Sequence, residues 1–320
     1  MKPIQHIKIT KNMQVSELVE AMSETGVMGA GRIARAVDIL KKMFADKECT
    51  IFFGQAGAMV PGGMKDILQD ILLTGRIGVF VTTGATLTHD TVESLGHKHY
   101  QGSACVDDAE LHKKGLDRMY DSYMPNAVYE DLEDFFQKNG DTLAKAKNIR
   151  DLLHIIGSLL PAEPKSILRI CYEQKIPVFC PALADSGIGL MIWGRLAAGK
   201  KMDIPAFDDL KEIISIAWDS KKNGVFYIGG GVPKNFCQQA MQFSKQASYG
   251  VQITTDRPEW GGSSGAELRE GISWGKMQAN AEFVDVFCDA TIALPLIWAA
   301  TICDKKNDCR EVFSYTKMHI

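Results

Sequence analysis

A short segment near the end of the chain gathers several side chains that could do covalent chemistry. A lysine beside a tryptophan in a partly dry cleft can have its pKa lowered enough to act as an amine nucleophile and form an imine. Spacing alone leaves other interpretations open: a solvated surface lysine, a tryptophan in the core, and glutamates on the exposed face of a helix. The segment is GGSSGAELREGISWGKMQ at 261–278, with the candidates Ser263, Ser264, Glu267, Glu270, Trp274 and Lys276.

Glycine-containing loops follow four predicted strands. In a parallel sheet such loops lie at the carboxyl ends of the strands, where they form the ligand crevice, and glycine lets backbone N–H groups approach a phosphate. Several converging loops predict a dinucleotide site, whereas a tight turn without a ligand is the alternative for any one of them. The loops are GQAGAMVPGG (54–63), TTGAT (82–86), ALADSGIG (182–189) and GGGVPK (229–234). In the last of these, Pro233 suits the first turn of a helix.

Another glycine motif, Gly29-Ala30-Gly31-Arg32-Ile33-Ala34, fits the dinucleotide fingerprint G-x-G-x-x-A. The fingerprint requires a strand before it, and VSELVEAMSETG reads instead as a helix that ends in a turn. The motif is therefore predicted to be a helix N-terminus rather than a phosphate loop.

The elements that position these loops alternate between short apolar runs and helix-period stretches, which predicts a parallel sheet wrapped by helices. The runs are apolar on both faces, as in buried parallel strands. Strands are predicted at 50–54, 77–83, 176–183, 224–230, 249–255 and 283–289. Helices are predicted at 32–44, 64–72, 144–158, 164–174, 207–221, 233–246 and 290–303. The fold class is therefore α/β, with a single doubly wound, mostly parallel sheet of Rossmann-like topology.

No proline- or serine-rich linker and no fixed-period repeat divides the 320 residues, so we expect a single domain over 1–320. The stretch from about 85 to 145 breaks the alternation and reads as an insertion carrying surface loops.

Composition excludes several classes of protein. Lys plus Arg (36) nearly balance Asp plus Glu (39), and no dense basic cluster is present, so nucleic acid is not an expected partner. The eight cysteines form no C-x-x-C pair, which argues against a zinc ribbon or a disulfide scaffold.

His97 and His99 are expected to be exposed loop residues, and we expect no metal. The N-terminus lacks a signal-peptide core and the apolar run at 290–303 is short and carries Pro295, so we expect a cytoplasmic protein without membrane contact.

Four runs resemble the deoxyhypusine synthase family in order and spacing: IPVFCPALADSGIG, GVFYIGGGVPKN, SSGAELREGISWGK and VDVFCDATIALPL. FFGQAGAMVPGG and VTTGATLTHD also match, so the likeness extends from about residue 30 to 303. SWGK in this setting is highly specific. The resemblance implies a homotetramer in which NAD oxidises an amine, a lysine holds the aminobutyl group as an imine, and an acceptor receives it. That acceptor is a protein lysine, or a small amine in close relatives.

Residue by residue, the resemblance implies that Lys276 is the imine-forming lysine and that Trp274 and Glu270 contact the polyamine. Positions at or beside family NAD contacts are Thr83, Asp185, Gly229, Gly230, Thr255, Gly261, Ser264, Asp289 and Ala290.

The chain departs from the family pattern mainly in the polyamine half of the site. Thr88 and His89 stand where the family has an acidic pair, and Leu190 and Ser263 stand at aspartate positions. Asn235 stands at a histidine position. Removing one partner of a desolvated ion pair costs roughly 2 to 5 kcal/mol, so a triply charged donor is expected to bind poorly. His89, Asn235 and Ser263 are therefore predicted to belong to a rebuilt substrate site.

The sequence thus predicts an NAD-dependent aminoalkyl transferase that acts through Lys276 on a small amine or polyamine. Two alternatives stay open. A simple NAD-dependent amine dehydrogenase would need no imine-forming lysine. A catalytically diverged NAD-binding protein would explain the lost carboxylates.

Overall fold

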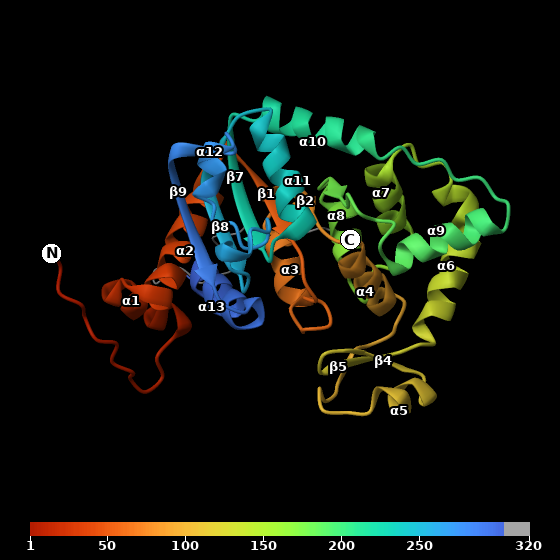
Figure 1. The fold of residues 1–320 in the computed structure, drawn as a ribbon, viewed down its shortest axis with the longest axis horizontal. Helices are drawn as coiled ribbons and strands as arrows, with labels where there is room; N and C mark the ends of the chain where they lie inside the picture. The colour runs from red at the N-terminus through yellow and green to blue at the C-terminus, as the bar shows by residue number, and fades with distance from the viewer. Residues whose placement is uncertain (304–320) are drawn as a thin grey trace. The chain divides into compact units, whose positions relative to one another are not determined.

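The computed structural model describes residues 1–303. Its main sheet has six strands in the order β6-β2-β1-β7-β8-β9 (Figure 1). The pairs β6/β2, β1/β7, β7/β8 and β8/β9 are parallel. This arrangement confirms the α/β class and the mostly parallel sheet. The strands are β1 (Cys49–Gln55), β2 (Ile77–Val81), β6 (Val178–Phe179), β7 (Lys222–Ile228), β8 (Ala247–Thr254) and β9 (Met277–Phe287).

The strand order reverses direction beside β1. From β1 the chain moves outward to β2 and β6, then returns to β7 on the other side of β1 and moves outward again to β8 and β9. In open α/β sheets ligands bind outside the carboxyl ends of the strands at such a switch point. The carboxyl ends of β1 and β7, at Gln55 and Ile228, therefore mark the expected position of a ligand crevice.

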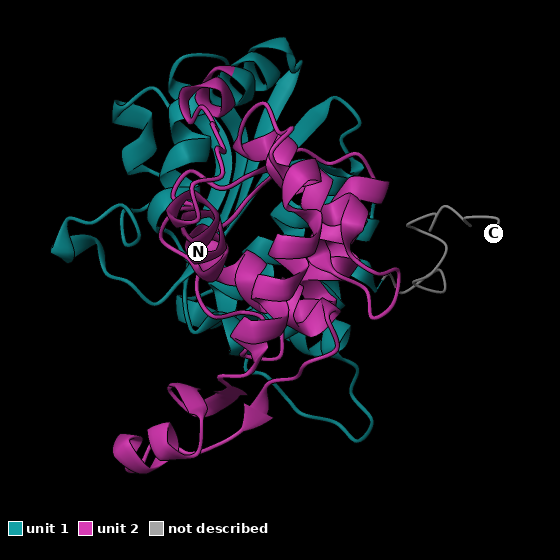
Figure 2. Cartoon of the chain, turned by 90° about the vertical axis from the view of Figure 1, so that its right-hand side faces the viewer, with its two compact units in different colours: residues 1–55, 73–79, 212–320 teal, residues 56–72, 80–211 magenta. Residues whose placement is uncertain are grey.

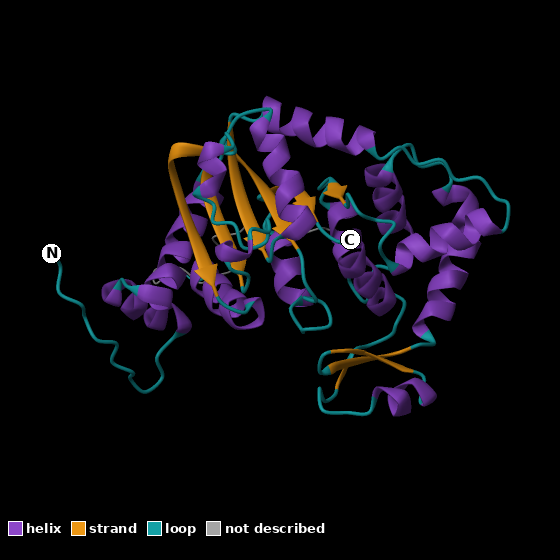
Figure 3. Ribbon diagram, viewed as in Figure 1, coloured by secondary structure: helices purple, strands orange, loops and turns teal. Residues whose placement is uncertain are grey.

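The helices, drawn purple in Figure 3, separate most of the strands along the chain. They are α1 (Val15–Thr25), α2 (Met28–Ala45), α3 (Lys65–Leu73), α4 (Gly84–Ser94), α5 (Asp108–Lys113), α6 (Val128–Leu143), α7 (Ile149–Leu159), α8 (Ile167–Glu173), α9 (Gly187–Ala197), α10 (Phe207–Asp219), α11 (Gly231–Gln242), α12 (Glu270–Ser273) and α13 (Ala290–Ile302). A 3-10 turn, η1, spans Pro258–Trp260.

The described chain divides into two compact units (Figure 2). Unit 1 comprises residues 1–55, 73–79 and 212 onward, and unit 2 comprises residues 56–72 and 80–211. The single domain expected over 1–320 stays a prediction.

Cys309, one of the eight cysteines, lies outside the described residues, and the seven described cysteines are free thiols.

Successive residues along the strands of unit 1 point to opposite faces of the sheet. Gly224 of β7 faces α2, since a Cβ there would lie 2.6 Å from Sδ of Met43. Gln252 of β8 and Asp285 of β9 are register partners on the other face, where both hydrogen-bond the segment 266–268. The first face is covered by the apolar side of α2, whereas the second carries buried polar groups that hydrogen-bond residues 266–268.

The glycine motif at 29–34 lies inside the first turns of α2, as predicted. Gly31 packs against the backbone of Gly26, which ends α1 in the left-handed conformation with φ 71°. These glycines therefore let two helices approach each other and form no phosphate loop after a strand.

Unit 2 is more regular than the sequence predicted. The stretch 85–145, expected to carry mainly surface loops, contains α4, α5 and α6 and a three-stranded antiparallel sheet. That sheet has the order β3-β5-β4, with β3 (Tyr100–Gln101), β4 (Leu116–Met119) and β5 (Ser122–Pro125). Helix α9 was also missed, because its sequence GIGLMIWGRLA is apolar almost all round and shows no helical period. The strand predicted at 176–183 shrinks to the two residues of β6.

Candidate active site

The SWGK turn joins α12 to the start of β9. Gly275 has φ 68°, a left-handed conformation that glycine adopts without strain, and it separates Trp274 from Lys276. The backbone N–H of Lys276 donates to the carbonyl of Gly271 at 2.8 Å, and its carbonyl accepts from Ala247 at 3.0 Å. The backbone of the lysine is therefore fixed from both sides before its side chain does any chemistry.

Two opposing effects act on the ammonium group of Lys276. Its Nζ lies 5.1 Å from the ring centroid of Trp274, a contact that favours the charged form. Partial burial lowers the pKa of Lys276 below its usual value, while the charge of Glu270 opposes the shift. The tryptophan is 56% exposed, so the neutral amine is favoured by burial of the lysine and not by the ring.

A second lysine bonds the segment before this turn. Lys234, in the first turn of α11, is only 1% exposed, and its Nζ donates to the carbonyl of Ala266 at 2.5 Å. Burial lowers the pKa of Lys234 to about 8, against the opposing charges of Asp285 and Glu270. The positive charge of Lys276 lowers it further. Two lysines with lowered pKa values therefore act on each other in one part of unit 1.

Asp285 supports the same segment from the sheet. Its carboxylate accepts from the backbone N–H of Leu268 at 3.1 Å and from Nε2 of Gln252 at 3.0 Å. Burial raises the pKa of Asp285 to about 6, although the bond from Leu268 and the charge of Lys234 act in the opposite direction. Gln252 also donates to the carbonyl of Ala266 at 3.1 Å. Asp285, Gln252 and Lys234 together hold residues 266–268, which end five positions before the SWGK turn begins.

The GGG loop at the carboxyl end of β7 packs closely against Ser264. A Cβ on Gly230 would clash with the Cα of Ser264, so only glycine fits there. Gly229 and Gly231 have φ 70° and 59°. Helix α11 begins here without a side-chain cap, so its first N–H groups are open to an anion. The structure thus brings three predicted cofactor residues, Gly229, Gly230 and Ser264, to one place.

Other predicted residues of unit 1 lie at strand and helix ends. Thr255 follows β8, and its neighbour Thr254, buried, donates to the carbonyl of Ser264 at 3.3 Å. Asp289 caps α13, where it accepts from the backbone N–H of Thr291 at 2.7 Å. The remaining positions are Ser263 and Gly261, both exposed, Ala290 at the start of α13, and Asn235, half-buried on α11.

Three predicted residues lie in unit 2. Thr83 caps α4 and accepts from the backbone N–H of Thr86 at 3.2 Å. Asp185 is exposed in the turn before α9. His89 lies on α4, half-buried, and its Nδ1 is 2.9 Å from Nε2 of His99. The prediction that His99 is an exposed loop residue is wrong, because its side chain is only 6% exposed and bonds Glu93.

Lys234 was not predicted as a site residue, although the spacing of residues along α11 indicates that it is buried. Lys234, Cys237, Gln238 and Met241 are spaced i, i+3, i+4 and i+7, and all four are buried. A lysine on the buried face of a helix, directly after a glycine loop, is a group whose pKa must shift.

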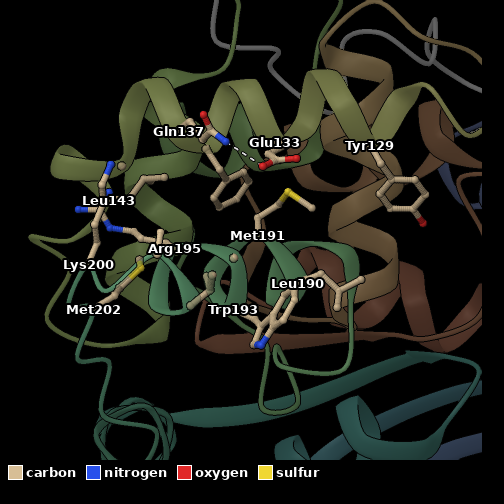
Figure 4. A pocket seen from close by; sticks show the side chains of 15 residues that line it. Tyr129, Glu133, Gln137, Leu143, Leu190, Met191, Trp193, Arg195, Lys200 and Met202 are labelled. Atoms are coloured by element: carbon tan, nitrogen blue, oxygen red, sulfur yellow. Dashed lines mark hydrogen bonds between the residues drawn. The ribbon is translucent and has the colours of Figure 1, made fainter.

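A separate pocket of about 550 Å³ lies between α6 and α9 in unit 2 (Figure 4). Tyr129, Glu133 and Gln137 line it from α6, and Leu190 and Trp193 line it from α9. Leu190 therefore contributes an apolar side chain to this pocket.

The family model described as deoxyhypusine synthase matches residues 17–301. The chain belongs to the deoxyhypusine synthase family. "Probable deoxyhypusine synthase 1" of Methanosarcina acetivorans is 46% identical over 300 residues, covering 93% of this chain and 94% of the relative. The protein of the same name from Archaeoglobus fulgidus is 40% identical over 292 residues, covering 91% and 95%. A solved structure from Entamoeba histolytica that is assigned to deoxyhypusine synthase has a TM-score of 0.62 at 20% identity, covering 93% of this chain and 96% of that one, and shows the shared fold.

Membership of the deoxyhypusine synthase family agrees with the resemblance in SWGK and the glycine loops. Among residues 1–303 no helix is both long and apolar enough to span a membrane. Within the same residues, no group of three or more His, Cys, Asp or Glu side chains is arranged to hold a metal ion.

Proposed function

We propose that the protein is an NAD-dependent aminoalkyl transferase, of the aminobutyl type, in which Lys276 carries the alkyl group as an imine. The observation that supports this most directly is the position of Lys276, which is fixed on a rigid turn, partly buried and lowered in pKa. A neutral amine is the form that adds to an electrophilic carbon. Family membership supplies the reaction class.

The residues at the carboxyl end of β7 fit a pyrophosphate. Gly230 leaves no side chain between the loop and Ser264, and the N-terminus of α11 is uncapped. The site lies beside the switch point of the sheet, where dinucleotides bind in doubly wound folds. Gly229, Gly230 and Ser264 would hold NAD there. Thr83, Asp185, Thr255, Gly261, Asp289 and Ala290 stay predicted cofactor contacts.

NAD, when bound, takes a hydride from the carbon next to the donor's nitrogen and later returns it. Nζ of Lys276 then adds to the oxidised carbon, and the original amine leaves with a proton. The alkyl group is now joined to Lys276 as an imine. The acceptor amine would add to the same carbon and displace Lys276, which leaves an imine between acceptor and alkyl group. Bound cofactor would supply the hydride that reduces this imine to the product amine.

Glu270 and Trp274 are proposed to bind the donor around this reaction. The ring of Trp274 is exposed beside the lysine and offers a face to a second ammonium group. Glu270, also exposed, supplies negative charge near Lys276. Asn235 and Ser263 are proposed to place neutral hydrogen-bonding groups where the family has a histidine and an aspartate. We further propose a cytoplasmic homotetramer that uses a small amine or a protein lysine as acceptor.

Counting NADH against product tests the proposal. Because the hydride leaves and returns within one cycle, complete turnover gives no net NADH. The pure protein is incubated with NAD and either putrescine or spermidine, and the nicotinamide absorbance is followed together with product mass. NADH that accumulates in step with product would support an amine dehydrogenase instead. NAD binding without turnover of either amine would support the diverged binding protein.

A further inference from the structure

Polar side chains of unit 2 form a continuous hydrogen-bonded chain that the sequence did not predict. Nζ of Lys65 lies 3.1 Å from Oε2 of Glu93, and Oε1 of Glu93 lies 2.8 Å from Nδ1 of His99. Nε2 of His99 then lies 2.9 Å from Nδ1 of His89. We call Glu93, His99 and His89 the histidine relay. Its two rings are 4.9 Å apart and inclined by 63°.

The direction of each hydrogen bond in the histidine relay follows from its acidic end. Burial alone would raise the pKa of Glu93, but the bond from His99 and the charge of Lys65 outweigh it and hold that pKa below its usual value. An ionised carboxylate only accepts, so Nδ1 of His99 must donate. In a neutral imidazole the other nitrogen is then an acceptor. With His99 neutral, its Nε2 accepts from Nδ1–H of His89.

The consequence is a fixed tautomer of His89. Because its Nδ1 carries the proton, its Nε2 is a bare acceptor. Within residues 1–303, Nε2 of His89 has no hydrogen-bond partner. It is also not fully buried, since it is absent from the buried side-chain atoms that lack a partner. Burial, with a smaller effect from His99, lowers the pKa of His89 to about 4, and the charge of Glu93 opposes this shift. The accepting form is thus the one present at neutral pH.

The neighbouring Thr88 has a different role. Its hydroxyl donates to the carbonyl of Gly84 at 2.9 Å and accepts from the backbone N–H of Ile188 at 3.2 Å. Thr88 is only 3% exposed, and its hydroxyl links α4 to α9. Of the pair that replaces the family's two acids, only His89 has a free polar atom for a ligand.

We propose that His89 is a specificity-determining residue that accepts a hydrogen bond from an N–H of the amine substrate through Nε2, in a tautomer set by His99 and Glu93. The inference rests on the proposed function, since it takes an amine as the ligand. An imidazole nitrogen accepts from an ammonium group without adding negative charge. His89 therefore recognises the hydrogen-bonding geometry of one end of the amine. Compared with a carboxylate, it should increase the affinity for a more highly charged amine by less.

Nitrogen-15 NMR of the histidine rings tests the tautomer without any turnover. We expect the wild type to show His89 protonated on Nδ1 and bare on Nε2. Glu93→Gln should mix the tautomers of both histidines, because an amide can donate as well as accept. His97, which pairs with Asp131 outside the relay, offers the matched control. His97→Gln should leave the tautomers of His89 and His99 unchanged. A wild-type His89 that carries its proton on Nε2 would overturn the proposal.

Titration with putrescine in the presence of NAD tests the ligand role. We expect the Nε2 resonance of His89 to move on addition of putrescine. His89→Leu should weaken the apparent affinity for putrescine about tenfold or more, the loss expected for a hydrogen bond to a charged group. His97→Leu should change it less than about twofold. Thermal unfolding of both variants checks that a weakened affinity is not a loss of fold.

Different results would overturn the ligand role of His89 and the transferase reaction. A wild type with the expected tautomer but no response of His89 to putrescine or spermidine would overturn the ligand role of the relay. Absence of an imine on Lys276, with the response of His89 intact, would instead overturn the transferase proposal and leave an amine-binding protein.

Discussion

Nζ of Lys276 lies 5.1 Å from the ring centroid of Trp274, and the single residue between them, Gly275, has φ 68°. Without the left-handed glycine, the chain could not turn back so sharply and bring the two side chains together. The ring favours the ammonium form, whereas burial, which outweighs the charge of Glu270, lowers the pKa of Lys276. A lowered pKa increases the fraction of neutral amine, which is the form that must add to carbon.

The close packing of Gly230 against Ser264 predicts a specific loss of cofactor affinity. Gly230→Ala should raise the Kd for NAD about tenfold or more, because the new methyl group must push the loop away from Ser264. Gly262→Ala is the matched control, since a Cβ there meets nothing within 4 Å. Calorimetric titration with NAD measures both. Equal affinities for the two variants would show that the GGG loop does not hold the cofactor.

Asp285 predicts a distinct dependence of stability on pH. Its pKa is raised to about 6 in the folded chain, so between about pH 4 and pH 6 the folded state holds a proton that the unfolded state has lost. Stability from this group is therefore lost as the pH rises through that window. Asp285→Asn removes the effect and keeps an oxygen acceptor for Leu268 and Gln252.

As the pH rises from about 4 to about 6, the free energy of unfolding of Asp285→Asn should increase relative to that of the wild type. The increase should be about 3 kcal/mol at most. Urea unfolding at a series of pH values measures the difference. A difference that stays constant across the window would mean that Asp285 has the same pKa in the folded and unfolded chain.

The replaced carboxylates predict a changed preference among donors. Spermidine carries about three positive charges, and each ammonium without a partner in a dry cleft incurs a desolvation cost. Putrescine or agmatine should therefore be the better donor in direct competition. The double variant Leu190→Asp, Ser263→Asp should raise the use of spermidine relative to putrescine about tenfold.

Leu196 offers the control for that experiment, because it is also exposed on α9. Leu196→Asp adds a charge to the same helix and should leave the ratio of donors unchanged. The proposed rebuilding of the substrate site is wrong if the wild type already prefers spermidine and the double variant changes nothing.

Much of the fold could be predicted because buried parallel strands leave a clear pattern. The run that forms β7 is apolar on both faces, and residues such as Phe226 are fully buried. The antiparallel sheet of unit 2 left no such pattern, since its strands have two to four residues and are largely exposed or half-buried. Helix α9 was missed because exposed Leu190 and Trp193 make its sequence apolar on every side.

The candidate site was predictable only where one residue type decides the chemistry. Lys276 could be proposed from the resemblance carried by SWGK, and the GGG loop could be proposed from its place after a strand, because a pyrophosphate needs open backbone N–H groups. The partnership of His89 with His99 could not, because ten residues and the turn after α4 separate them. The buried partners of Asp285 likewise depend on strand register, which the sequence does not state.

Trapping the imine would show whether Lys276 is the covalent carrier of the alkyl group. The protein is incubated with NAD and putrescine, reduced with borohydride, digested and examined by mass spectrometry. The wild type should carry an alkyl adduct on Lys276, and Lys276→Ala should carry none while still binding NAD. Lys221→Ala, at an exposed lysine that pairs with Glu48, should keep the adduct. An adduct of the same mass that persists in Lys276→Ala, or none in a wild type that completes the transfer, would contradict the covalent role of Lys276.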